Sequence, residues 1–362
     1  MKLYPLKFEP IVKKMIWGSE SWEISCRPNE MSIIENGEFA GTRFDEFILK
    51  NPAAILGEDC AKNSKNPAAI PGEDFKKNNS QKNFFENFSF PLLVKIIDAR
   101  EILSVQVHPD DAYAAKKRST DTGKSECWYI LKPPTDGFLI VGLKNGVTRE
   151  ILAAAYENGT VERCLNRLHV TRGDIVKIPA GLIHALTPGA IIAEIQQNSD
   201  ITYRLYDFNR TGADGNPREL HVKDALATID FTRGARFRLR KTIAAEKTTS
   251  RECTFSREKK SRATVKHFLR EKKSHATVKH FSLEKKIICA TEKFFSDEKK
   301  FSIYTAVEGA AFFETREHSV FLPETRSVFI PAGLGEFTIR AQKNSATLLF
   351  SAPNCPTPHI IQ

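Results

Sequence analysis

Long apolar runs and closely paired cysteines are missing from this chain of 362 residues. No stretch approaches the roughly twenty apolar residues that a helix needs to cross a bilayer, and the first residues lack the apolar core of a secretory signal. The seven cysteines include no C-x-x-C pair, which argues against a zinc ribbon and against a disulfide framework. We therefore expect a soluble, cytoplasmic protein with reduced thiols and no membrane partner.

The chain also lacks a balance of positive and negative charge: its formal net charge is +10. Such an excess can indicate a nucleic-acid partner. The segment 241–300 alone holds 17 Lys and Arg against 8 Asp and Glu, so it carries +9 and the rest is nearly neutral. It repeats Ala-Thr-Val-Lys-His-Phe at 263–268 and 276–281 and contains no nucleic-acid motif, which is typical of a basic solvated loop. The charge therefore argues against nucleic-acid binding and is compatible with a small-molecule enzyme.

The stretch 103–109, Leu-Ser-Val-Gln-Val-His-Pro, alternates apolar and polar residues with the period of a strand. Its three apolar side chains are expected to pack into a core, so the opposite face carries Ser104, Gln106 and His108. Burying an amide beside an imidazole costs several kcal/mol unless a partner satisfies them, and a divalent metal would be such a partner. A lone His is more often structural, so this interpretation requires further ligands.

Two later segments supply such ligands. In the strand-like run 124–131, Glu126 faces the same side as the bulky Trp128 and Ile130. In 173–184, a strand opened by Gly-Asp and closed by Pro-x-Gly is followed by His184. The combined set suits a borderline divalent ion such as zinc, with one side open to water or substrate. The candidate metal ligands are Gln106, His108, Glu126 and His184.

These segments carry a family resemblance. Residues 173–184 match the second cupin motif, G-x5-P-x-G-x2-H, at every fixed position. Together with 104–109, 123–128 and 196–204, they make the chain resemble type I mannose-6-phosphate isomerase in its short bacterial form. The resemblance covers residues 1–240 well and the C-terminal part weakly. It implies a mainly β fold with a small α insert, a bicupin of two jelly-roll-like β-barrels.

The same resemblance, together with the repeats, predicts the domain organisation. An N-terminal metal-binding cupin domain occupies 1–240, with a helical insert around 109–170 and a repeat-bearing loop around 50–85. A basic, repeat-rich insertion follows at 241–300. The remainder of a degenerate C-terminal cupin domain occupies 301–362, where the Pro-x-Gly turn recurs without the following His.

The resemblance implies that the protein interconverts mannose 6-phosphate and fructose 6-phosphate through a cis-enediol, with one zinc ion as cofactor. Arg204 follows His184 at the family interval to an essential arginine, and it is carried over as catalytic together with Lys124. A guanidinium can hold a phosphate or a developing enediolate with two parallel hydrogen bonds. The expected substrate-binding residues are Ser104, Lys95, Trp17, Glu194 and Asp200.

Two other classes remain open from the residues alone. Two His and one Glu could bind iron and activate oxygen, as in the facial-triad oxygenases, although Gln106 and the charges of Lys124 and Arg204 suit a phosphosugar better. The repeat insertions also fit a non-catalytic cupin that only binds a sugar phosphate. The sequence does not assign the base that moves the proton.

Overall fold

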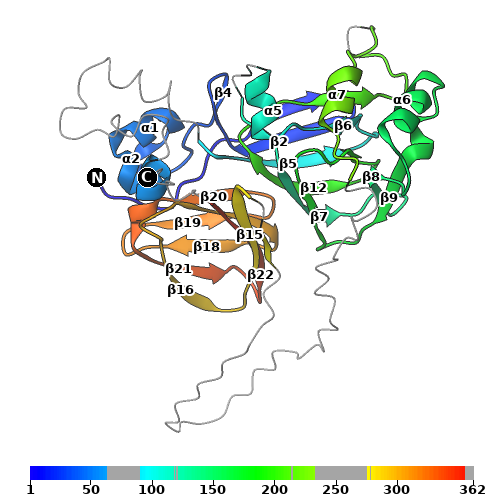
Figure 1. Cartoon of the computed structure of the whole chain (residues 1–362). Helices are drawn as coiled ribbons and strands as arrows, with labels where there is room; N and C mark the ends of the chain where they lie inside the picture. Colours follow the sequence, from blue (N-terminus) through cyan, green and yellow to red (C-terminus); the bar gives the residue numbers. More distant parts are fainter. Residues whose placement is uncertain are drawn as a thin grey trace.

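The computed structural model describes residues 1–62, 90–117, 119, 121–212, 215–232, 275–277 and 279–354. Within these ranges the protein is mainly β with a few short helices (Figure 1). Two expectations lie largely outside them, since residues 63–85 of the repeat-bearing loop and 241–274 of the basic insertion are not described. None of the helices in the described part is long and apolar enough to cross a membrane.

Two antiparallel sheets form the first half of the chain. Their strand orders are β1-β2-β5-β12-β7-β10 and β13-β6-β11-β8-β9. The six-stranded sheet consists of β1 (Ile11–Met15), β2 (Gly18–Ile24), β5 (Leu92–Ala99), β12 (Ile191–Gln197), β7 (Glu126–Lys132) and β10 (Ile175–Ile178). The five-stranded sheet consists of β13 (Tyr203–Tyr206), β6 (Val105–Val107), β11 (His184–Ala185), β8 (Phe138–Leu143) and β9 (Leu165–His169). A separate two-stranded ribbon pairs β3 (Cys26–Arg27) with β4 (Glu30–Met31).

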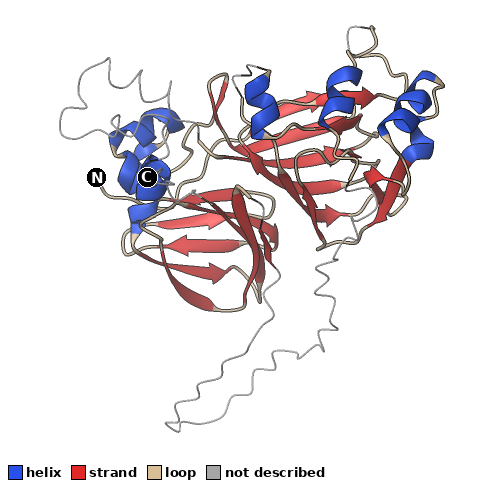
Figure 2. Cartoon of the chain, viewed as in Figure 1, coloured by secondary structure: helices blue, strands red, loops and turns tan. Residues whose placement is uncertain are grey.

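Short helices lie beside the sheets of both halves of the chain (Figure 2). They are α1 (Phe44–Lys50), α2 (Pro52–Leu56), α3 (Glu58–Lys62), α5 (Asp111–Lys116), α6 (Arg149–Glu157), α7 (Val222–Thr228) and the 3₁₀ turns η1 (Gly37–Phe39), η3 (Val161–Cys164) and η4 (Ala332–Leu334). Asp110 and Thr148 cap α5 and α6, because their side chains accept the backbone N–H groups of Tyr113 and Ile151. Helices α6 and α7 pack on the outer face of the five-stranded sheet.

The alternation of β6 decides which side chains enter the space between the two sheets. Val105 and Val107 join the cluster beneath α6 and α7, so Gln106 between them faces the interior. Leu103 was expected beside the two valines, and this is wrong, because it packs in the inter-sheet cluster with Trp128. The physical reason is that the strand starts only at residue 105, so the alternation does not extend to Leu103.

The second half of the chain forms two further antiparallel sheets, with the orders β14-β15-β22-β17-β20 and β16-β21-β18-β19. Their strands are β14 (His275–Thr277), β15 (Phe281–Ile288), β16 (Thr291–Phe295), β17 (Ser302–Glu308), β18 (Ala311–Glu314), β19 (Ser319–Leu322), β20 (Ser327–Ile330), β21 (Glu336–Ala341) and β22 (Ala346–Pro353). Although β14, β15 and β16 fall within the segment 241–300, β15 pairs with β22 and β16 with β21. The described part of that segment is therefore integrated into the C-terminal sheets.

Aromatic side chains and one ion-pair network join the two halves. Phe44, Phe90 and Phe301 surround Phe329 in one buried cluster, with ring centroids 5.1 Å apart for Phe44 and Phe329 and 4.9 Å apart for Phe90 and Phe301. Burying side chains of this size contributes roughly 1.5–3 kcal/mol each. Arg326 additionally reaches β2, as described below.

The cysteines of the described residues largely match the expectation of reduced thiols. Cys26, Cys127 and Cys164 have free thiols. Cys60 on α3 is disulfide-bonded, which corrects the expectation at that position.

Candidate active site

Three acid-base side chains from both sheets of the first half converge in its interior. Glu126 begins β7 of the six-stranded sheet, His184 begins β11 of the five-stranded sheet, and His108 follows β6 directly. Their ligand atoms lie within 4.8 Å of one another, and none of the three residues is more than 1% exposed. Oε1 of Glu126 lies 3.1 Å from Nε2 of His108, and Oε2 lies 3.8 Å from Nε2 of His184.

Backbone carbonyls determine which nitrogen of each imidazole faces the cluster. Nδ1 of His108 lies 2.9 Å from the carbonyl oxygen of Ile201, and Nδ1 of His184 lies 2.8 Å from that of Leu182. A carbonyl oxygen can only accept, so both Nδ1 atoms carry the proton and both Nε2 atoms present lone pairs toward Glu126. Nε2 of His108 is buried and has no hydrogen-bond partner among the described residues. Converging lone pairs with backbone-oriented imidazoles are the arrangement that a divalent metal requires.

The protonation states fit the same conclusion. Burial lowers the pKa of His184 to about 3, and burial followed by the nearby Lys124 ammonium lowers the pKa of His108. Burial alone would raise the pKa of Glu126, but Lys124 and then the imidazoles hold it well below its ordinary 4.5. Two neutral imidazoles and one carboxylate are therefore present at neutral pH.

Gln106, on the neighbouring strand β6, lies beside this cluster. It pairs in register with His184 across β6 and β11, and the Nε2 atoms of the two side chains lie 3.5 Å apart. Because the two ends of an amide have the same shape, turning this group over would present Oε1 to the cluster instead. Gln106, the fourth expected ligand, thus lies beside the other three residues.

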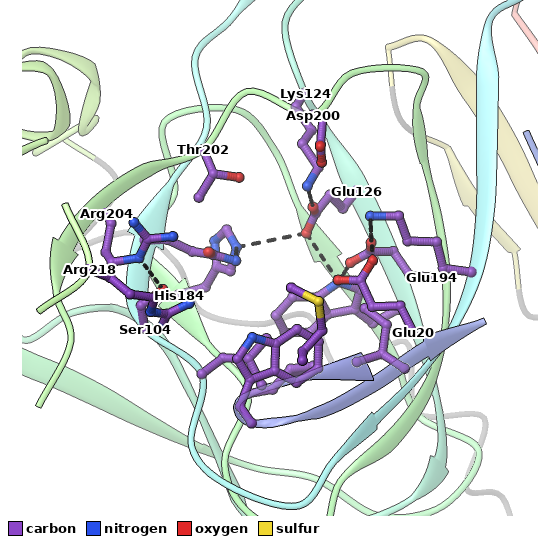
Figure 3. Close-up of a pocket in the computed structure, with 18 residues that line it drawn as sticks. Glu20, Ser104, Lys124, Glu126, His184, Glu194, Asp200, Thr202, Arg204 and Arg218 are labelled. Carbon is purple, nitrogen blue, oxygen red and sulfur yellow. Dashed lines mark hydrogen bonds and ion pairs between the residues drawn. The ribbon is translucent and has the colours of Figure 1, made fainter. Parts of the chain in front are cut away.

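The cluster adjoins a cavity of about 230 Å³ between the two sheets (Figure 3). All of the candidate site residues expected from the sequence except His108 line it, and His108 belongs to the adjoining cluster. Sequence reasoning missed further polar lining residues, because they come from loops or from a strand position without any motif. These additional residues are Glu20, Thr202 and Arg218.

One side of the cavity is positively charged. Nε of Arg204 lies 3.3 Å from the hydroxyl of Ser104, and Nη1 donates to the carbonyl oxygen of Glu219 at 2.7 Å. Burial lowers the pKa of Arg204, as does the neighbouring Arg218. Arg218 is held in turn by Asp207, with Nε 2.7 Å from Oδ2. Figure 3 shows Arg204, Arg218 and Ser104 together on one side of His184.

The opposite side carries a buried carboxylate. Trp128 Nε1 donates to Oε2 of Glu194 at 2.7 Å, and burial, reinforced by the charge of Glu126, raises the pKa of Glu194 to about 8. Lys95 is only 3% exposed, and its Nζ lies 3.9 Å from Glu194 and 3.3 Å from Glu20. The Lys95 ammonium, expected to bind substrate, is therefore close to two acidic side chains, Glu194 and Glu20, across the cavity from the arginines.

Lys124, Asp200 and Trp17 complete the cavity wall. Lys124 is 5% exposed, and its Nζ lies 2.9 Å from Oε1 of Glu126. Burial would lower the pKa of Lys124, but the surrounding carboxylates of Glu126, Glu194 and Asp200 raise it above its ordinary value. This ammonium therefore stays charged beside the metal-type cluster.

The fold is mainly β, and it holds a buried His-Glu-His cluster beside a cavity lined by charged side chains, so the protein has a candidate metal site next to a pocket. Sequence comparisons specify the family. Residues 6–127 match the catalytic domain of type I phosphomannose isomerase, and residues 271–349 match the cupin domain of mannose-6-phosphate isomerase. Mannose-6-phosphate isomerase ManA of Bacillus subtilis is 34% identical over 246 residues, which is 64% of this chain and 69% of that protein. Mannose-6-phosphate isomerase of Streptococcus mutans is 32% identical over 248 residues, with the same coverage.

The chain therefore belongs to the type I mannose-6-phosphate isomerase family. Solved structures agree over a greater length. The mannose 6-phosphate isomerase of Bacillus subtilis superposes with a TM-score of 0.71 at 25% identity, covering 96% of this chain and 99% of that one. A mannose 6-phosphate isomerase bound with zinc and yttrium shares the fold, with a TM-score of 0.61 at 15% identity over 97% of this chain and all of that one.

Proposed function

We propose that this enzyme interconverts mannose 6-phosphate and fructose 6-phosphate by moving a proton between C2 and C1 through a cis-enediol. The observation that supports this most strongly is the convergence of the Glu126 carboxylate with the Nε2 atoms of His108 and His184, directly beside a cavity with two arginines. Membership of the isomerase family supports the same reaction.

The metal in this proposal is zinc, held by His108, Glu126, His184 and Gln106. Imidazole and carboxylate ligands suit zinc, and the side facing the cavity is free for substrate. When bound, the ion would supply Lewis-acid polarisation of the sugar oxygens. Lys124 would offset the charge of Glu126 and donate to an oxygen of the substrate, since its ammonium remains protonated.

The phosphate in this proposal occupies the arginine side. Arg204 and Arg218 offer guanidinium groups that can bind phosphate oxygens in pairs, and the Ser104 hydroxyl can donate a further hydrogen bond. The sugar would then extend past the metal ligands toward Trp17 and Lys95. This direction places the reacting carbons between the two charged sides of the cavity.

Glu194 is the group that we propose for proton transfer. Because its pKa is raised to about 8, both the carboxylate and the carboxylic-acid form of Glu194 are populated near neutral pH. This suits a group that must accept and return a proton. Its hydrogen bond from Trp128 fixes the orientation of the carboxyl group. Asp200 lies on the same cavity wall and would orient Lys124.

The domain organisation in this proposal is that of a bicupin, with the two pairs of sheets as its jelly-roll-like barrels. The N-terminal metal-binding domain spans 1–240, and the degenerate C-terminal domain starts within 241–300. The integration of β14 to β16 into the C-terminal sheets supports this boundary.

A coupled assay that follows mannose 6-phosphate to fructose 6-phosphate tests the proposal, before and after treatment with a chelator. The expected result is turnover that the chelator removes and zinc restores. Sugar-phosphate binding without turnover in the zinc-loaded protein would instead identify a non-catalytic binding protein. Oxygen uptake by the iron-loaded protein would identify an oxygenase.

A further inference from the structure

Asp111, at the first position of α5, connects two other segments of the chain, which lie 12 and 86 residues away in the sequence. Its Oδ1 atom accepts the backbone N–H of Gly123 at 3.0 Å and the side-chain Nε2 of Gln197 at 3.1 Å. Gly123 precedes β7, and Gln197 ends β12. Hydrogen bonds to a charged acceptor are stronger than those between neutral groups, so one carboxylate oxygen fixes both segments.

Gln197 also forms hydrogen bonds with the backbone between Gly123 and Glu126. Its Oε1 atom accepts the N–H of Ser125 at 2.9 Å, and its own backbone N–H donates to the carbonyl oxygen of Ser125 at 3.1 Å. The N–H of Lys124 donates to the carbonyl oxygen of Pro109 at 2.9 Å. Three consecutive N–H groups just before β7, at residues 123, 124 and 125, thereby donate to other segments of the chain.

The backbone of Gly123 lies so close to the backbone of Asp110 and Asp111 that there is no room for a side chain between them. A Cβ atom at this position would lie 2.5 Å from the carbonyl carbon of Asp110 and 2.5 Å from the backbone nitrogen of Asp111. No side chain fits there unless the backbone of α5 or of the segment moves. The start of α5 and the entrance to β7 are therefore in direct backbone contact.

We propose that Asp111 is a positioning residue for Lys124 and Glu126. These two side chains leave the held backbone at residues 124 and 126, and their charged ends lie 2.9 Å apart at the metal-type cluster. Asp111 itself does not line the cavity, so it acts on the site only through the backbone and Gln197. The expected effect of Asp111 on kcat rests on the proposed function, whereas its expected effect on metal affinity does not.

The test compares three variants of the full chain. Asp111→Ala removes the acceptor, whereas Asp111→Asn retains an Oδ1 that can accept both hydrogen bonds. Glu317→Ala is the control, because it removes an exposed carboxylate that pairs only with Lys2 in the described structure. Zinc affinity is measured by competition with a chromophoric chelator, kcat and KM by the coupled assay, and folding by thermal unfolding.

The expected result is that Asp111→Ala weakens zinc binding about tenfold and lowers kcat by a similar factor, with KM little changed. Asp111→Asn should restore both to within about twofold of the unmodified protein, and Glu317→Ala should change neither. If Asp111→Ala fails to fold, Gln197→Ala serves in its place with the same expectation for zinc binding.

Two results would overturn the inference. One is a lower unfolding temperature for Asp111→Ala with unchanged zinc affinity and kcat, which would make the residue merely structural. The other is equal impairment of Asp111→Asn and Asp111→Ala, which would mean that the charge matters and not the two hydrogen bonds. If the unmodified protein does not isomerise mannose 6-phosphate, the proposed function fails, while the comparison of zinc affinities still decides the role of Asp111.

Discussion

Nε2 of His108 and Oε1 of Glu126 face each other at 3.1 Å, and each presents a lone pair to the other. Both side chains are 1% exposed, so bulk water does not separate them. Two acceptors at this distance repel each other unless positive charge lies between or beside them. The repulsion is stronger here because both groups are removed from water. Lys124 supplies part of that charge, and a divalent cation would supply the rest.

Removal of the metal is expected to abolish turnover. Incubation with a chelator should lower the rate of mannose 6-phosphate isomerisation by more than about 100-fold, and added zinc should restore it. Losing a residue that only hydrogen-bonds to a metal ligand typically costs about 10- to 100-fold in activity, and losing the ion itself should cost more. His184→Ala should lose the same activity without recovery at equal zinc. His169→Ala is the control, since His169 is exposed on β9. Full activity of the chelated protein would contradict the metal centre.

Arg204→Lys is expected to weaken phosphate recognition. A lysine keeps the charge but loses the paired N–H groups and the contact with Ser104, so kcat/KM should fall by about 10- to 100-fold. Inhibition by inorganic phosphate should weaken in parallel. Arg163→Lys, at an exposed position on η3, should leave both measurements unchanged. An unaltered phosphate inhibition constant in Arg204→Lys would show that the phosphate binds elsewhere.

Asp207 should stabilise the protein in a way that depends on pH. Burial would raise the pKa of Asp207, but hydrogen bonds from Arg218 and Arg210 outweigh it and lower the pKa below 3.8. A carboxyl group with a lowered folded-state pKa contributes its stability above the unfolded pKa and loses it as the pH falls through the folded one. Asp207→Asn should therefore lower the free energy of unfolding by about 1.5–3 kcal/mol near pH 7.

The difference between Asp207→Asn and the unmodified protein should shrink as the pH falls below about 4, which urea unfolding across that range would measure. Asp98→Asn is the control, because its partner Arg100 is largely exposed and such pairs contribute little. A difference that stays constant down to the lowest accessible pH would contradict the ion-pair explanation.

Arg326 is expected to couple the two halves of the protein. It extends from the start of β20 to Glu23 on β2, with Nε 2.9 Å from Oε2, and its Nη2 also lies 2.7 Å from Oε2 of Glu35. Glu23 is only 2% exposed, so Arg326→Met leaves a buried carboxylate without its cation and should cost about 3 kcal/mol in the free energy of unfolding.

The double variant Glu23→Gln/Arg326→Met should recover most of that loss, because no buried charge remains. Chemical unfolding of the two single variants and the double variant measures the coupling directly. Arg340→Met removes a partly exposed pair with Glu314 and should have a smaller effect. Equal destabilisation of the single and double variants would show that packing, and not charge pairing, accounts for the loss.

The metal-type cluster could be predicted largely from local patterns. Strand alternation placed Gln106 on the interior face, and it placed Glu126 with Trp128 and Ile130, which pack in the inter-sheet cluster. The turn residues before His184 matched a motif that spans only twelve residues. Such signals are readable because each depends on backbone geometry within one short segment.

Other features depend on contacts between distant segments, which no local pattern in the sequence reveals. Arg204 lies opposite Gln106 because β13 pairs with β6, a pairing that spans almost one hundred residues. Arg218 reaches the cavity from a loop with neither periodicity nor motif. The basic composition of 275–295 favoured a solvated loop, whereas pairing with β21 and β22 incorporates that stretch into sheets. Tertiary pairing thus overrode local composition.

The acceptors that orient the two imidazoles are the carbonyl oxygens of Ile201 and Leu182, which every amino acid possesses. Replacing either side chain with another of similar size therefore leaves the tautomers of His108 and His184 intact. Only a shift in the course of the peptide itself can disturb them. The tautomers of the two imidazoles are consequently insensitive to substitutions at residues 182 and 201, and changing them would require a shift of the backbone there, such as a loop insertion or deletion would cause.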